Sequence, residues 1–311
     1  MEFYHKSVLF DETIEGLNIR EGKTYVDGTI GGAGHSSEIL KRLGGTGFLV
    51  GIDQDDNALA KSNEVLGKIA ENYTLVKSNY KDFDVVLDDL GIDKVDGILL
   101  DLGVSSHQFD EGERGFSYNF DARIDMRMDN SKEFCAWDIV NTYSKEDLTR
   151  ILRDYSEEKW ASRIADFIVS DRQKKTIDTT FELVEVIKKA IPASARRKKG
   201  HPAKKTFQAL RIETNNELGV LTDALGKMID RLNPGGRIAI ISFHSLEDRI
   251  VKDEFKYYFK DCICPENTPI CICDKKREIN ILTRKPITAS EDELKENNRA
   301  HSAKLRVVEK L

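Results

Sequence analysis

The sequence has no apolar run that approaches the roughly 20 residues of a membrane-spanning helix. Residues 1–6, MEFYHK, also lack the basic and apolar regions of a secretory signal peptide. The apolar fraction of 40% is nevertheless ample for a buried core. We therefore expect a cytosolic protein of one large or two ordinary domains.

An excess of positive charge is also missing. The 311 residues contain 48 Lys and Arg against 54 Asp and Glu, which gives a net charge of −6. This balance is not typical of nucleic-acid-binding proteins, so any RNA binding must depend on a local patch. One strong patch is present at residues 196–205, RRKKGHPAKK. Taken alone, a basic run of this kind can equally be a solvated loop.

Cysteine is scarce, with five residues in the chain. Four of them form two C-x-C pairs, Cys262 with Cys264 and Cys271 with Cys273. In a reducing cytosol such a cluster favours metal binding or an inert role over disulfides. The pairs could supply four thiolates to zinc, but their spacing is tighter than the common C-x₂-C, so we assign no metal ligand. Cys135 stands alone in an apolar context and is expected in the core.

Two nucleotide-binding signatures, G-x-G-x-x-G and G-x-x-x-x-G-K-[ST], are absent from the glycine-rich stretch, which disfavours an NAD site and a P-loop. Residues 25–35, YVDGTIGGAGH, instead join a short apolar strand to a glycine turn and a helical pattern. In a doubly wound sheet this unit forms a nucleotide-sized crevice. Its glycines permit backbone angles that a side chain would forbid and let a ligand approach the main chain.

A second apolar strand ends in Asp53, about 20 residues further on, which suits a carboxylate that binds ribose hydroxyls. An adenosine ligand without a pyrophosphate fits this combination, and S-adenosylmethionine is the obvious one. A structural glycine turn in a different α/β fold stays open as the alternative.

The hydrophobic pattern alternates between strand and helix up to Asp101 and again after residue 217. Repeated β-α units of this length imply a parallel sheet with right-handed crossovers. The last two strands should be antiparallel, because the segment between them is too short for a helical crossover. This layout is typical of S-adenosylmethionine-dependent methyltransferases. The expected strands are residues 24–27, 47–53, 73–77, 95–101, 237–243, 279–283 and 305–308.

The middle of the chain shows helical patterns and no convincing strand. We interpret it as a helical domain inserted at a loop after the fourth strand, where insertion is best tolerated. The expected division is a methyltransferase core of residues 1–103 and 213–311 and an inserted substrate-recognition domain of residues 104–212. The expected helices of the insert are residues 136–140, 145–152, 159–170, 180–190 and 206–212.

Polar residues follow several expected strands, and in an open parallel sheet ligands lie beyond the carboxyl ends of the strands. Tyr80 could lie against adenine. For methyl transfer to an amino group on a base, an acceptor aimed at the N–H protons makes the nitrogen a better nucleophile. Asp101 is our candidate for this catalytic role, and holding the methionine part of the cofactor is its rival role. His244 could approach the substrate, or it could be a packed or capping histidine.

Longer motifs resemble the bacterial small-subunit rRNA methyltransferases of the RsmH (MraW) family, in order along nearly the whole chain. The motifs are the glycine stretch, DLGVSSHQFD at 101–110, RGFS at 114–117, DMRMD at 125–129, HPAKKTFQALRI at 201–212, SFHSLEDR at 242–249 and RAHSAKLR at 299–306.

The resemblance implies a class I methyltransferase fold with a helical insert, and N4-methylation of one cytidine in the decoding region of 16S rRNA. With an RNA substrate, within the small ribosomal subunit, the basic run becomes an expected phosphate-binding surface. The cofactor-binding residues expected from the strand ends and the resemblance are Gly32, Ala33, Gly34, His35, Asp53, Tyr80, Asp101 and Gln108. The expected RNA-binding residues are Arg196, Arg197, Lys198, Lys199, Lys204 and Lys205.

Two other functions are compatible with the residues alone. One is a methyltransferase that acts on a non-RNA substrate, for which the basic run would be dispensable. The other is a non-catalytic scaffold that binds RNA or metal, which would not bind S-adenosylmethionine.

Overall fold

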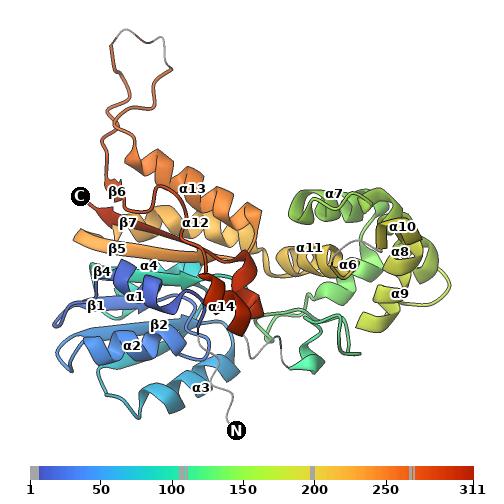
Figure 1. Ribbon diagram of the computed structural model, residues 1–311, viewed down its shortest axis with the longest axis horizontal. Coiled ribbons are helices and arrows are strands. Elements are labelled where there is room, and N and C mark those ends of the chain that lie inside the picture. The colour runs from blue at the N-terminus through green and yellow to red at the C-terminus, as the bar shows by residue number, and fades with distance from the viewer. Residues whose placement is uncertain (1–6, 105–108, 110, 197–199, 266–267, 269) are drawn as a thin grey trace. The chain divides into compact units, whose positions relative to one another are not determined.

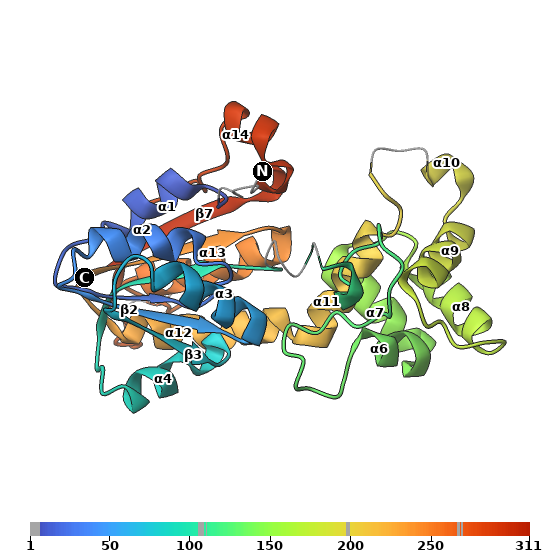
Figure 2. The same ribbon diagram turned by 90° about the horizontal axis from the view of Figure 1, so that it is seen from below.

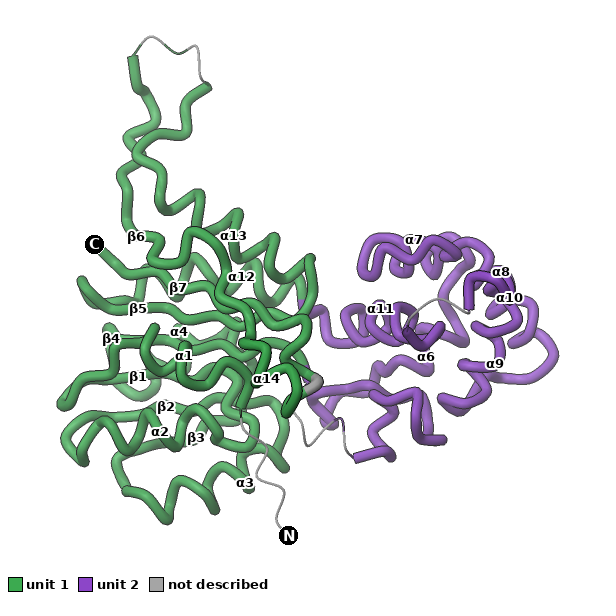
Figure 3. Tube along the Cα trace, in the orientation of Figure 1, with its two compact units in different colours: residues 1–103, 218–311 green, residues 104–217 purple. Residues whose placement is uncertain are grey.

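The computed structural model describes residues 7–104, 109, 111–196, 200–265, 268 and 270–311. The chain divides into two compact units, which Figure 3 colours separately. Residues 1–103 and 218–311 form unit 1, and residues 104–217 form unit 2. The second boundary lies five residues beyond the expected 212, because helix α11 (Lys204–Asn215) runs on past that position.

Unit 1 is built on a seven-stranded sheet with the strand order β3-β2-β1-β4-β5-β7-β6 (Figure 1). Strands β1 to β5 pair in parallel, whereas β7 is antiparallel to both of its neighbours. The expected α/β fold class with one reversed strand is therefore confirmed. The strands are β1 (Thr24–Asp27), β2 (Phe48–Asp53), β3 (Tyr73–Lys77), β4 (Val95–Asp101), β5 (Leu232–Ser242), β6 (Ile279–Ile281) and β7 (Lys304–Lys310).

Strand β5 begins five residues earlier than the hydrophobic pattern indicated. Its first residues include Pro234 and Gly235, which read as a loop after the preceding helix. Leu232 pairs with Val95, and the register then shifts before Gly97 pairs with Arg237. An irregularity of this kind accommodates Pro and a left-handed Gly235 (φ 76°) inside a strand.

Helices cover both faces of the sheet (Figures 1 and 2). Alternate strand residues point to opposite faces, so Val26 and Val50 pack with α4, α12 and α13, whereas Tyr25 and Leu49 pack with α1, α2 and α3. No helix among the described residues is both long and apolar enough to cross a bilayer. The helices are α1 (Phe10–Leu17), α2 (Gly34–Arg42), α3 (Asp56–Leu66), α4 (Phe83–Asp89), α12 (Glu217–Asp230), α13 (Ser245–Phe259) and α14 (Glu291–Glu296).

Unit 2 is helical and has its own apolar core. Side-chain caps begin two of its helices: Ser144 accepts a hydrogen bond from the Asp147 N–H, and Thr179 with Glu182 forms a capping box. Among its described residues the only β-type pairing is one isolated bridge, Arg123 with Thr179. The helices are α6 (Ala136–Thr142), α7 (Lys145–Ser156), α8 (Ala161–Arg172), α9 (Thr180–Ala190), α10 (Ala193–Arg196) and α11 (Lys204–Asn215).

A long loop of unit 2 contains the motif DMRMD and is held by the end of α11. The Asn215 side chain donates to the Met126 carbonyl (2.8 Å) and accepts from the Met128 N–H (2.8 Å). Arg127 pairs with both oxygens of Asp125 (2.8 and 2.6 Å). These contacts give the motif a structural role in unit 2.

Gly115 in this loop has a left-handed φ of 71°, and a Cβ there would lie 2.3 Å from the Arg123 carbonyl oxygen. We expect Gly115→Ala to destabilise unit 2 by about 3 kcal/mol, because backbone strain adds to a clash that no rotamer can relieve. Urea unfolding followed by tryptophan fluorescence measures this, since both tryptophans, Trp137 and Trp160, lie in unit 2.

Gly200→Ala is the matched control. Gly200 also has a positive φ (107°), but a Cβ there meets no atom within 4 Å. Its cost should be limited to the conformational strain of about 1–2 kcal/mol. Equal losses in the two variants would contradict the steric explanation.

Candidate active site

Asp27 ends β1 and ties it to the start of α2. Its side chain is 2% exposed and accepts hydrogen bonds from the Thr29 N–H (3.1 Å) and the Ser36 hydroxyl (2.6 Å). Burial raises the pKa of Asp27 to about 6, and the two hydrogen bonds oppose the rise. Asp27 is not among the residues predicted for the site from sequence, although a carboxylate at the end of a strand followed by glycine is a signal for it.

The loop after β1 is fixed to the neighbouring strand β4. The Gly28 N–H donates to the Leu99 carbonyl (2.9 Å), and the Thr29 hydroxyl oxygen accepts from the Asp101 N–H (2.7 Å). A Cβ at Gly28 would lie 2.6 Å from a Leu100 methyl group and 3.2 Å from the Tyr80 Cβ. Glycine is therefore required for this close approach, which also brings Tyr80 beside the loop.

Asp53 ends β2 and fixes the same loop from the other side. It accepts hydrogen bonds from the Gly31 N–H (2.9 Å) and the Asp55 N–H (3.0 Å), one on each carboxyl oxygen. Burial raises the pKa of Asp53 above its usual range. A carboxylate has about four acceptor sites, so each oxygen keeps capacity for a further donor such as a ligand hydroxyl.

The glycine turn leads into α2 with its backbone accessible at one position. A Cβ at Gly32 would meet no atom within 4 Å. Ala33 follows in the left-handed region (φ 60°) as the N-cap of α2, and its N–H donates to the Ile30 carbonyl (2.8 Å). A Cβ at Gly34 would lie 2.0 Å from the Ser7 hydroxyl, so the N-terminal segment passes against the start of the helix.

His35 has a buried side chain that faces Asp101. Its Nε2 lies 3.2 Å from the Val8 carbonyl, so this nitrogen carries the proton, and its ring stacks on Phe10. Burial lowers the pKa of His35 to about 4. The imidazole is thus neutral at pH 7, and its Nδ1, 3.7 Å from an Asp101 oxygen, forms no ion pair there.

Asp101 ends β4, at the same edge of the sheet as Asp53. Its Oδ1 is buried and has no hydrogen-bond partner within the described residues, although 30% of the side chain is exposed. Burial raises its pKa to about 8, with smaller contributions from the carboxyls of Asp27 and Glu247. An unpaired acceptor of this kind needs a partner, and its proton is exchangeable near neutral pH.

Tyr80 begins a short 3₁₀ turn (Tyr80–Asp82) directly after β3. Its side chain is half-buried against the apolar cluster of the β4 and α4 side of the sheet. Asn79 holds the turn by accepting from the Lys81 N–H (3.0 Å) and donating to Gln54 (2.8 Å). The aromatic residue is therefore fixed at the same edge as Asp53.

His244 lies at the start of α13, and one nitrogen of its ring caps the helix. Its Nδ1 accepts from the Glu247 N–H (3.4 Å), and Glu247 accepts from the N–H groups of Phe243 (2.8 Å) and His244 (3.2 Å). This reciprocal arrangement starts α13. The Nε2 on the other side of the ring is buried 3.1 Å from a Glu247 carboxyl oxygen and has no hydrogen-bond partner among the described residues.

The basic run lies in unit 2, and the structure describes Arg196 and residues 200–205 of it. Arg196 ends α10, and Lys204 and Lys205 form the exposed first turn of α11. Lys205 donates to the Glu157 carbonyl (2.8 Å), whereas Lys204 has no carboxylate partner among the described residues. His201 stacks on Tyr118 with ring centroids 4.3 Å apart. Arg197, Lys198, Lys199 and the expected cofactor residue Gln108 lie outside the described residues.

The structure thus brings the strand-end residues of unit 1 together at one edge. Asp53, Tyr80 and Asp101 contact or adjoin a single loop, residues 28–34. The edge offers an open backbone position at Gly32, spare acceptor capacity and a carboxyl whose pKa lies near neutrality. This arrangement suits a ligand with hydroxyl and cationic groups, next to a proton acceptor.

Comparison with known proteins gives a match along the whole length. Residues 2–311 match the MraW methylase family. A protein from Finegoldia magna named ribosomal RNA small subunit methyltransferase H is 58% identical, with 100% of both chains covered. Its namesake from Clostridioides difficile is 56% identical, again with 100% of both covered. The structure also resembles a solved rRNA methylase from Streptococcus thermophilus, at 11% identity and a TM-score of 0.45. The match covers 99% of this chain and 98% of the other.

The raised pKa of Asp101 makes a prediction about stability. Between about pH 4 and pH 8 the unfolded chain has released a proton that folded Asp101 retains, so stability falls as the pH rises through this interval. Asp101→Asn removes this pH-dependent loss of stability, because the amide does not titrate. We expect its stability relative to the unsubstituted protein to increase from pH 5 to pH 8 by at least about 1.4 kcal/mol, the equivalent of one pKa unit.

Urea unfolding followed by circular dichroism at both pH values measures the difference. Asp223→Asn is the control, because Asp223 is an exposed carboxyl on α12. A difference between Asp101→Asn and the unsubstituted protein that stays constant with pH would show that the Asp101 carboxyl is not perturbed.

Proposed function

The chain belongs to the MraW methylase family, and on this basis we propose that it methylates N4 of one cytidine in the decoding region of 16S rRNA with S-adenosylmethionine. The observation that supports this most directly is the buried carboxyl oxygen of Asp101 beside the glycine loop, which has no hydrogen-bond partner among the described residues. A substrate of this kind implies a cytoplasmic enzyme that works on rRNA within the small ribosomal subunit.

The residues at this edge of the sheet fit S-adenosylmethionine, which supplies an electrophilic methyl group on a sulfonium sulfur. Gly32 leaves open space over the main chain, and Asp53 keeps acceptor sites for ribose hydroxyls. Ala33, Gly34 and His35 would contribute backbone groups at the start of α2, since the His35 ring already lies against the Val8 carbonyl. Tyr80 would lie against the adenine, and Gln108 completes the proposed set of contacts.

Asp101 is the proposed catalytic residue. The lone pair of a cytosine amino nitrogen is delocalised into the ring, so the nitrogen is a poor nucleophile. A carboxylate that accepts an N–H hydrogen bond localises this pair and takes up the positive charge that develops on the nitrogen. The raised pKa of Asp101 would fall beside a cationic ligand, so the carboxyl becomes an acceptor when the site is loaded.

Unit 2 is the proposed RNA-recognition domain. Residues 196–205 carry six basic side chains, and Arg196, Lys204 and Lys205 are exposed. Other lysines of unit 2 are paired, for example Lys174 with Asp171 (3.0 Å) and Lys188 with Glu185 (2.8 Å). Lys204 and Lys205 form no ion pair among the described residues and are better available for phosphates. We propose them as phosphate contacts together with Arg196–Lys199, the rest of the basic run.

The test of this function is methylation of small ribosomal subunits from a strain that lacks the protein. We expect the protein to restore N4-methylcytidine at one position of 16S rRNA, located by mass mapping. Asp101→Asn should lower kcat by about 10²–10⁴-fold, the usual contribution of an acid–base group. Its affinity for S-adenosylmethionine should change little if Asp101 acts on the cytosine amine.

Asp53→Ala serves as the comparison variant, because we expect it to change the affinity for S-adenosylmethionine, which Asp101→Asn should leave nearly unchanged. Loss of a charged hydrogen-bond acceptor should weaken S-adenosylmethionine binding by about 1–3 kcal/mol, measured by calorimetry. If Asp101→Asn also weakens binding by this amount, Asp101 holds the methionine part of the cofactor. Absence of any S-adenosylmethionine binding would favour a non-catalytic scaffold instead.

The phosphate-binding role is tested by the salt dependence of RNA binding. We expect Arg196→Ala with Lys204→Ala to weaken binding of a 16S rRNA fragment. The slope of log K against log salt should fall by about 0.7 for each phosphate that the variant no longer neutralises. Lys174→Ala with Lys188→Ala is the control of equal charge change. An identical slope in both double variants would favour a methyltransferase with a non-RNA substrate.

A further inference from the structure

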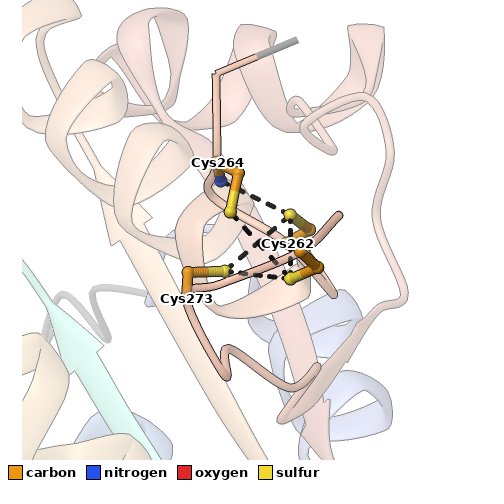
Figure 4. A group of neighbouring side chains, drawn as sticks. Cys262, Cys264 and Cys273 are labelled. Atoms are coloured by element: carbon orange, nitrogen blue, oxygen red, sulfur yellow. Dashed lines mark hydrogen bonds between the residues drawn. The ribbon is translucent and has the colours of Figure 1, made fainter. Parts of the chain in front are cut away.

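Four cysteine side chains converge in the segment between α13 and β6, which projects away from the sheet in Figure 1. We call this segment, residues 260–278, the hairpin. Cys262 and Cys264 lie on its first arm, and Cys271 and Cys273 lie on its second arm. Their four sulfur atoms all lie within 4.8 Å of one another. Figure 4 shows the labelled cysteines pointing toward a common centre.

The distances between the sulfur atoms match one tetrahedral metal ion. The Cys271 Sγ lies 3.5 Å from the sulfurs of Cys262 and Cys273 and 3.9 Å from that of Cys264. Zn²⁺ with four thiolates at about 2.3 Å has sulfur–sulfur edges of about 3.8 Å. A disulfide requires about 2.05 Å. An iron–sulfur cluster would spread its ligands over several metal atoms and hence farther apart.

Backbone amides in the hairpin point at the sulfur atoms. The Ile263 N–H donates to Cys273 Sγ, and the Ile272 N–H donates to Cys264 Sγ, both at 3.4 Å. The Cys264 N–H also donates to Cys262 Sγ at 3.4 Å. The first two of these bonds join the two arms of the hairpin. Such donors stabilise negative charge on thiolates and orient metal ligands.

Apolar burial does not account for this arrangement. The isoleucines of the hairpin, Ile263, Ile270 and Ile272, are 45%, 76% and 79% exposed. A short segment without a core usually needs a metal or a disulfide for a defined conformation. The cysteines are free thiols at distances that exclude a disulfide.

The base of the hairpin is held independently of the cysteines. The Lys275 ammonium lies 5.0 Å from the ring centroids of both Tyr257 and Tyr258, and the Arg277 guanidinium lies 4.0 Å from that of Phe259. The Glu278 N–H donates to the Tyr258 carbonyl (2.9 Å). Loss of the cysteine cluster should therefore loosen the hairpin without unfolding unit 1.

We propose that Cys262, Cys264, Cys271 and Cys273 form a structural Zn²⁺ site that fixes this hairpin. Thiolate ligands in a tetrahedral arrangement select zinc among the common cellular metals. Binding releases the thiol protons to solvent as the four sulfur–zinc bonds form, so affinity rises with pH. This site differs from the expectation from sequence, where the tight C-x-C spacing gave no metal ligand.

The test is the metal content of the full-length protein purified under reducing conditions, followed by reconstitution with Co²⁺. We expect one zinc per chain by mass spectrometry of the metals, and thiolate-to-metal and d–d absorption bands of a tetrahedral thiolate site with Co²⁺. Cys262→Ser with Cys271→Ser should reduce the zinc to less than a tenth of an equivalent. The same variant should be cleaved by trypsin in the hairpin much faster than the zinc-loaded protein.

Cys135→Ala is the matched control, because Cys135 lies in unit 2 and should leave the zinc content unchanged. The circular dichroism and S-adenosylmethionine affinity of the double variant check that unit 1 stays folded. The proposal is overturned if the reduced protein contains no zinc and gives no thiolate–Co²⁺ bands, if it contains stoichiometric iron instead, or if the double variant keeps its zinc.

Discussion

The candidate site depends on the hydrogen bonds that hold the loop after β1 between two neighbouring strands. Gly31 donates to Asp53 at the end of β2, and Thr29 accepts from the backbone of Asp101 at the end of β4. Because β1 lies between β2 and β4 in the sheet, both contacts follow from the strand order. One loop therefore fixes the positions of both carboxylates without any long side chain between them.

This arrangement places three carboxyls on one edge of unit 1 at a cost in stability. Burial raises the pKa values of Asp27, Asp53 and Asp101, which means that the fold holds each in a place that disfavours its charged form. Asp27 and Asp53 recover part of the cost through hydrogen bonds, whereas Asp101 Oδ1 has none among the described residues. Strain of this kind is typical of a functional group that awaits its ligand.

Much of the fold was predictable from residue patterns, because strand and helix periods are local. Strands β1, β3 and β4 and helix α9 have the expected bounds. The start of β5 was not predictable, since Pro234 and Gly235 enter the strand only through an irregular pairing with β4. The extension of α11 to Asn215 depends likewise on contacts with the DMRMD loop, far away in sequence.

The sequence by itself determined the fold class, the family and the strand-end carboxylates, because these depend on periodicity, motif identity and spacing. Only the tertiary structure decided what those side chains do. It places His244 at the cap of α13, turns the His35 ring toward Val8 and leaves Asp101 Oδ1 without a hydrogen-bond partner in the part of the chain that the structure describes. It also brought together four cysteines whose spacing had argued against a metal. The physical reason is that burial and hydrogen-bond partners come from strands and hairpin arms that meet only in the folded chain.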